Sequence, residues 1–193
     1  GGGSKLTHQS VVEDKITLIS TQGADQIAPI FCSDRGEITA RLEWCGYGIE
    51  NEERGWNDYK GRDLAGAIAV IVRGTPPDAK ADATAAAPDP HQETQIASKS
   101  GGWSGSGSIF TKVMTAKRHG AIGVVLLPAK ADEPLLRFDA GHAARAGIPA
   151  VALAAKAARD LEPNYLDGID AKPAEARTVG TAKATLTADV IRE

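Results

Sequence analysis

Two short, uninterrupted apolar segments constrain the fold of this chain more than any other feature of its sequence. They are residues 67–72, Ala-Ile-Ala-Val-Ile-Val, and residues 121–127, Ala-Ile-Gly-Val-Val-Leu-Leu. Their length and their content of β-branched residues predict strands that are buried on both faces. A shorter run at residues 150–153, directly after Pro149, predicts a third strand.

A helix is predicted between the first two runs, over residues 109–119. Ser108 is placed to cap its N-terminus, and Gly120 stands just beyond its C-terminus. Apolar residues at helical spacing predict the face that packs on the core, and they are Ile109, Phe110, Val113 and Met114. The last turn carries Lys117, Arg118 and His119, whose positive charge suits the helix dipole. The order strand, helix, strand implies a right-handed crossover if the two strands pair in parallel.

Alternating apolar and polar residues predict further strands at residues 15–20, 37–45 and 182–190. A second helix is predicted over residues 154–162, because it would stop before Pro163. We therefore expect an α/β (α+β) fold, in which a twisted, mixed and partly barrel-like sheet carries two or three packed helices.

The composition changes between Thr75 and Ser108, where Pro, Ala, Asp, Gly and Ser dominate. We expect a long flexible loop near residues 77–107, since few residues there could anchor a core. Residues 1–4, Gly-Gly-Gly-Ser, are interpreted as a linker or tag remnant. Residues 5–193 are interpreted as a single domain.

The formal net charge of −3 argues against nucleic acid as a main partner, because phosphate binding needs a concentrated basic face. No apolar run in the sequence approaches the length that spans a bilayer. The two cysteines, Cys32 and Cys45, are compatible with either redox compartment. For this pair we favour unpaired, largely buried thiols.

The sequence shows no pattern typical of a catalytic or metal site. It lacks His-Glu-x-x-His, and its four histidines, His8, His91, His119 and His142, are widely separated. Residues 102–106, Gly-Trp-Ser-Gly-Ser, match a nucleophile elbow only in part, and no strand directly precedes them. We therefore predict no catalytic residue and no metal ligand. A small serine hydrolase that uses Ser104 or Ser106 is the less favoured alternative.

Three aromatic residues in glycine-rich or polar surroundings are candidates for a recognition surface: Trp56, Tyr59 and Trp103. The alternative for each of them is that its ring packs a loop onto the domain.

Three segments are more informative together than any single motif. The first is Gly46-Tyr47-Gly48-Ile49 with residues 57–76, which begin Asn57-Asp58-Tyr59-Lys60-Gly61-Arg62-Asp63 and end Arg73-Gly74-Thr75-Pro76. The second is residues 110–127, with His119-Gly120-Ala121 at the end of the helix, and the third is Ile148-Pro149-Ala150-Val151-Ala152-Leu153. In order and spacing they resemble the protease-associated domain of bacterial secreted zinc aminopeptidases, relatives of the transferrin receptor and glutamate carboxypeptidase. The resemblance covers residues 37–162, with departures at Ala67, where the family usually has lysine, and in the loop 77–107.

This resemblance implies a fold like that of the protease-associated domain and a non-catalytic accessory role. The role would be to shape substrate access, to recognise proteins or to hold an oligomer together. It implies that zinc is held only by the peptidase domain of the same parent chain, so no cofactor is expected here. That domain and peptide or protein substrates would be the partners, in a secreted or periplasmic protein. The main alternative is a free-standing protein-binding scaffold, which differs in whether the gene continues past Glu193.

Overall fold

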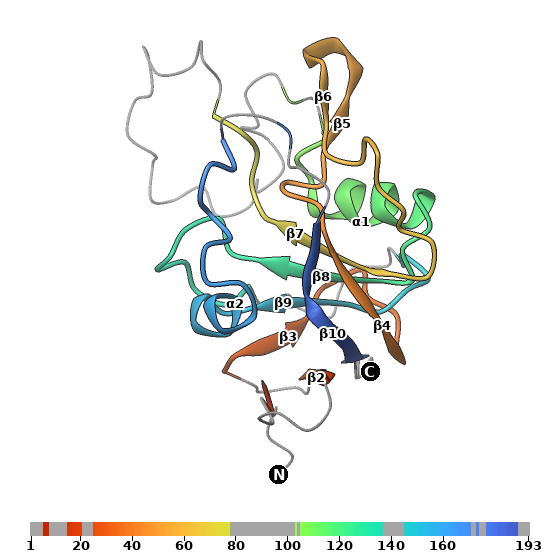
Figure 1. The fold of residues 1–193 in the computed structure, drawn as a ribbon, viewed down its shortest axis with the longest axis vertical. Coiled ribbons are helices and arrows are strands. Elements are labelled where there is room, and N and C mark those ends of the chain that lie inside the picture. Colours follow the sequence, from red (N-terminus) through yellow and green to blue (C-terminus); the bar gives the residue numbers. More distant parts are fainter. Residues whose placement is uncertain are drawn as a thin grey trace.

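A computed structural model describes residues 6–7, 15–20, 25–77, 103, 105–136, 145–170, 173 and 177–188. Most of the strands in this part of the chain join one mixed sheet of eight strands, in the order β1-β2-β10-β4-β7-β8-β9-β3 (Figure 1). Their bounds are β1 Leu6–Thr7, β2 Lys15–Ser20, β3 Ile27–Pro29, β4 Gly36–Trp44, β7 Ile68–Val72, β8 Gly123–Leu127, β9 Ala150–Leu153 and β10 Arg177–Ala188. The sheet curls into a half-barrel, which confirms the predicted fold class.

The centre of the sheet is parallel. β4, β7, β8 and β9 run in the same direction, and Val70 of β7 lies between Trp44 on one side and Val125 on the other. Helix α1, Ile109–Arg118, connects β7 to β8, as the order strand, helix, strand predicted. The sheet is mixed because β10 pairs in parallel with β2 and antiparallel with β4.

Both faces of β7, β8 and β9 are buried, as the apolar runs predicted. Alternate side chains of a strand point to opposite faces, so Val70 and Ile71 enter two different hydrophobic cores. The core around Val70 is completed by Ala158 of helix α2, Ala155–Leu161. The core around Ile71 is completed by Val113 of α1.

The remaining predicted elements are found within a few residues of their expected bounds. The largest difference is β10, which begins at Arg177, earlier than predicted. Its register against β4 shifts between Thr178 and Lys183. The regular pairing with β4 resumes at Lys183, which is where the alternation of apolar and polar residues had predicted the strand. Cys32 and Cys45 are both buried and no disulfide joins them, as predicted. The predicted flexible loop falls mostly on residues 78–102, outside the described residues.

One predicted core residue is corrected. Met114 is exposed, with 36% of its surface accessible, although its helical spacing had placed it on the buried face of α1. The buried residues of this helix are Lys112, Val113, Thr115 and Ala116. The helix therefore turns toward the sheet a face that includes a lysine, and Met114 lies outside it. Neither helix of the described residues is long and apolar enough to cross a membrane.

Candidate recognition surface

A two-stranded hairpin is separate from the main sheet and stands above α1 in the view of Figure 1. It consists of β5, Glu50–Asn51, the 3-10 turn η1, Glu52–Arg54, and β6, Trp56–Asn57. The turn forms because the Asn51 side chain accepts a hydrogen bond from Arg54 N at 3.1 Å, and Gly55 closes it with a φ of 62°. Residues 52–55 are exposed, so the tip of the hairpin is available to a partner.

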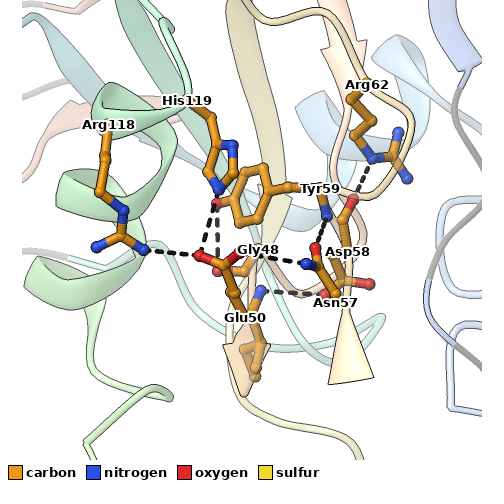
Figure 2. A network of polar contacts seen from close by, with 9 residues as sticks. Gly48, Glu50, Asn57, Asp58, Tyr59, Arg62, Arg118 and His119 are labelled. Atoms are coloured by element: carbon orange, nitrogen blue, oxygen red, sulfur yellow. Dashed lines mark hydrogen bonds and ion pairs between the residues drawn. The ribbon is translucent and has the colours of Figure 1, made fainter. Parts of the chain in front are cut away.

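Glu50 fastens the hairpin to α1. Its Oε2 accepts a hydrogen bond from Arg118 Nη2 at 2.7 Å and lies 3.3 Å from His119 Nε2, as Figure 2 shows. Partial burial would raise the pKa of Glu50, but the hydrogen bonds from Arg118 and His119 outweigh it and hold that pKa below its ordinary value. The anchor is therefore a charge contact between a hairpin and the C-terminus of a helix 68 residues further on.

Tyr59 lies between the hairpin and the helix. Its ring stacks on His119 with the centroids 4.4 Å apart and the planes 5° from parallel. Its hydroxyl donates a hydrogen bond to the carbonyl of Gly48 at 3.2 Å, and the residue is 3% exposed (Figure 2). Burial raises the pKa of Tyr59. Tyr59 therefore packs between the hairpin and α1, and a recognition role for it stays a prediction.

Asp58 holds the base of the hairpin. Although it is 1% exposed, its Oδ2 accepts hydrogen bonds from Ile49 N and Trp56 Nε1, each at 3.0 Å. Arg62 donates to the carbonyl of Asp58 and to that of Trp44, at the end of β4. In the Asp-Tyr-x-Gly-Arg-Asp segment, Asp58 and Arg62 therefore have a structural role, because their hydrogen bonds hold this loop against the hairpin and the end of β4.

The two tryptophans meet at the side of the hairpin. Trp56 and Trp103 pack edge to face, with centroids 5.6 Å apart, and the Arg54 guanidinium lies 4.7 Å from the centre of the Trp103 ring. Trp103 also donates from Nε1 to the carbonyl of Pro76 at 3.0 Å and is 4% exposed, so its ring packs inward. Trp56 is half-buried. A recognition role for these residues stays a prediction.

Lys112 is the residue whose importance the sequence analysis missed. It is completely buried, and its Nζ donates to the carbonyl of Tyr47 and, at 3.4 Å, to that of Val72. Burial lowers the pKa of Lys112 to about 7, and the charge of Asp58 opposes this shift. Burial, together with a hydrogen bond to Asp170, raises the pKa of Tyr47. The amino group therefore fastens α1 to the end of β7 and to the turn that follows β4.

Within the described part of the chain, the candidates for chemistry do not come together. No group of three His, Cys, Asp or Glu side chains that could hold a metal occurs among the described residues. Burial raises the pKa of Cys45 to about 12, which disfavours the thiolate. Ser106 donates its hydroxyl to the carbonyl of Trp103. Ser104, His8, His91 and His142 lie outside the described residues.

Neither a protein-family model nor a curated protein matches the chain. Among solved structures, the chain is similar to an aminopeptidase from Aneurinibacillus sp. strain AM-1, with 23% identity and a TM-score of 0.43, over 81% of this chain and 28% of that one. It is also similar to a zinc aminopeptidase from Bacillus subtilis, with 16% identity and a TM-score of 0.40, over 88% and 28% of the two chains. A subtilisin-like protease from the Antarctic Pseudoalteromonas sp. AS-11 shows 14% identity and a TM-score of 0.37, over 91% and 31%. The chain spans less than a third of the length of each.

Proposed function

We propose that this chain is a non-catalytic accessory domain of a zinc aminopeptidase, of the protease-associated type. The sequence resemblance is the main support, and its three segments form one scaffold in space. The contact that carries the proposal is the buried amino group of Lys112, in the second segment, on the carbonyls of Tyr47 and Val72 in the first.

Two further contacts hold the three segments together. A Cβ on Gly48 would lie 2.9 Å from two carbon atoms of Ile71, so the first segment depends on glycine for this approach. The third segment joins the second because Val151 of β9 pairs with Val125 of β8. Residues shared with the family therefore build the interior of the domain rather than a reacting centre, which supports an accessory role.

In this role the hairpin tip is the surface that we expect to contact a partner. Its base is fastened by Glu50 and Asp58, while residues 52–55 stay exposed. A rigidly held projection suits a domain that shapes substrate access, recognises proteins or holds an oligomer together. The proposed partners are the peptidase domain of the parent chain, which would hold the zinc, and peptide or protein substrates. The proposed location is secreted or periplasmic.

The experiment is metal analysis and aminopeptidase assay on the same dialysed sample of the chain. The expected result is zinc far below one equivalent, and no release of amino acid from aminoacyl substrates or of acid from simple esters. Stoichiometric zinc with a turnover that a chelator abolishes would contradict the proposal, as would esterase activity lost in Ser106→Ala. Joining the chain to the peptidase domain of the proposed parent should give aminopeptidase activity. Substituting residues 52–55 should then change KM for long substrates more than for a dipeptide.

A further inference from the structure

A series of turns follows α2, over residues 163–170. Two of its side chains anchor it in a hydrophobic core, because Tyr165 is 2% exposed and Ile169 is 8% exposed. Between these anchors the chain passes through Asp167 and Gly168, which are both exposed. They are the only Asp-Gly pair in the sequence. An exposed pair is therefore held between two buried residues.

The backbone of these turns leaves Gly168 open to approach. Gly168 has a φ of 66°, and a Cβ added to it would meet no atom within 4 Å. Asp167 N donates to the carbonyl of Asn164 at 3.1 Å, and Ile169 N donates to that of Leu166 at 3.5 Å. Among the described residues, no backbone hydrogen bond starts from the nitrogen of Gly168 between them. This nitrogen is therefore accessible to a neighbouring group.

The carboxylate of Asp167 is the neighbouring group. Within the part of the chain that the structure describes, this side chain has no hydrogen bond and no ion pair. The Asp58 carboxylate differs, since it is buried and accepts hydrogen bonds from Ile49 N and Trp56 Nε1. A free aspartate side chain can turn its Cγ toward the next main-chain nitrogen, because the two atoms then close a five-membered ring.

We propose that Asp167 is a modification site, at which the folded chain converts aspartate to isoaspartate without an enzyme. Gly168 N attacks Cγ of the Asp167 carboxyl group in its acid form, and the new N–C bond closes a succinimide ring. The carboxyl OH and the amide proton leave together as water. A second water then adds to the main-chain carbonyl carbon of Asp167, and the bond from this carbon to Gly168 N breaks. One water is lost and one is gained, so the conversion needs no other reactant.

The conversion changes the path of the main chain. The chain then runs through Cβ and Cγ of Asp167, which adds one atom to the backbone between the anchors Tyr165 and Ile169. The residue after Ile169 is Asp170, whose Oδ1 accepts a hydrogen bond from the hydroxyl of Tyr47. We expect the longer backbone to move Asp170 and break this bond. The modification goes beyond the proposed accessory function and does not depend on it.

The test is incubation of the folded chain in 18O-labelled water, for the time in which half of a urea-unfolded sample converts. Each succinimide that opens takes up one labelled oxygen, and electron-transfer fragmentation of the peptides locates the isoaspartate. We expect label and isoaspartate at Asp167 and neither at Asp132, which is also exposed but precedes Glu133. Their absence from Asp167 in the folded chain, or an equal amount at Asp132, would overturn the proposal.

Two variants test the chemistry. Asp167→Glu should abolish the reaction, because the longer side chain would have to close a six-membered ring. Gly168→Ala should slow it, because the added Cβ hinders the approach of Cγ, although this Cβ has room in the turn. Gly61→Ala is the matched control, since Gly61 also has a positive φ and open space, and it should convert as the parent chain does. Equal rates in Gly168→Ala and Gly61→Ala would overturn the assignment to Gly168 N.

The structural consequence has a readout of its own. The NMR resonances of the Tyr47 ring should shift in the converted parent chain and stay unchanged in Asp167→Glu after the same incubation. Asp170→Ala, which lacks the acceptor of the Tyr47 hydroxyl, should show a similar shift without incubation. Unshifted Tyr47 resonances in a chain that carries isoaspartate would overturn the predicted loss of this hydrogen bond.

Discussion

Lys112 donates a hydrogen bond from Nζ to the main-chain carbonyl of Tyr47, although its whole side chain is removed from solvent. The folded state therefore disfavours the protonated amine, and the pKa of Lys112 falls from 10.5 to about 7. Between these two pH values the unfolded chain binds more protons than the folded chain. Stability consequently rises as the pH is raised from about 7 toward 10.

The first prediction is that Lys112→Met removes this pH dependence. The variant should lose about 1–3 kcal/mol of unfolding free energy at pH 9, because the carbonyl of Tyr47 then lacks its donor. The loss should be smaller at pH 7, because there the buried Lys112 of the parent chain is partly protonated, which lowers the unfolding free energy of the parent itself. Urea unfolding at pH 7, 8 and 9 measures both. Lys156→Met, on an exposed side chain, should follow the parent at every pH, and parallel curves for Lys112→Met would contradict the assignment.

The second prediction concerns the glycine that lets two segments approach. Gly48→Ala should destabilise by about 2–4 kcal/mol, since it combines a φ of 62° with a Cβ only 2.9 Å from Ile71 Cδ1. Gly61→Ala is the matched control, because Gly61 has a φ of 73° but no atom within 4 Å of the added Cβ. It should cost only the backbone strain, about 1 kcal/mol. Equal losses in thermal unfolding would show that the contact with Ile71 is irrelevant.

The third prediction tests the hairpin anchor. Glu50→Gln should lower global stability by no more than about 1 kcal/mol, because Arg118 is 65% exposed and solvent screens the pair. Amide exchange at residues 50–57 should nevertheless speed up, since the hairpin loses its link to α1. The pKa of Glu50 is lowered in the folded state, so the anchor holds above the ordinary range of a carboxyl group and weakens as the pH falls through the folded value. Exchange that is unaffected in Glu50→Gln, with Lys156→Gln as the control, would contradict the anchor.

The fourth prediction uses two neighbouring residues of α1. Val113→Ala should cost about 1.5–3 kcal/mol, because the side chain is fully buried, whereas Met114→Ala should lie within about 0.5 kcal/mol of the parent chain. Chemical denaturation of both variants gives the comparison. A greater loss of unfolding free energy in Met114→Ala than in Val113→Ala would contradict this prediction and would favour the buried position that the helical spacing predicted for Met114.

The central strands and α1 could be predicted because their signals are local. Residues 68–72 and 123–127 are apolar throughout, and Ser108 does accept the hydrogen bond from Thr111 N that was expected of a cap. The buried lysine could not be predicted in this way. Its acceptors, on Tyr47 and Val72, lie 65 and 40 residues away, and only the folded sheet brings them under the helix.

The candidate surface was predictable only in part. Composition identified Trp56, Tyr59 and Trp103 as unusual, but whether such rings face solvent depends on what the rest of the chain lays over them. Trp103 lies inside because the hairpin supplies Trp56 and Arg54 to cover it.

The pairing of β2 with β10 has a mechanical consequence. Six residue pairs, from Lys15 with Lys183 to Ser20 with Ala188, hold an early strand parallel to the last described strand. A force that pulls Lys15 and Ala188 apart acts along both strands in opposite directions. It must therefore slide one strand past the other and load the bonds of the ladder together, instead of opening them one after another. The chain is built so that tension between these two strands meets its greatest resistance at the start.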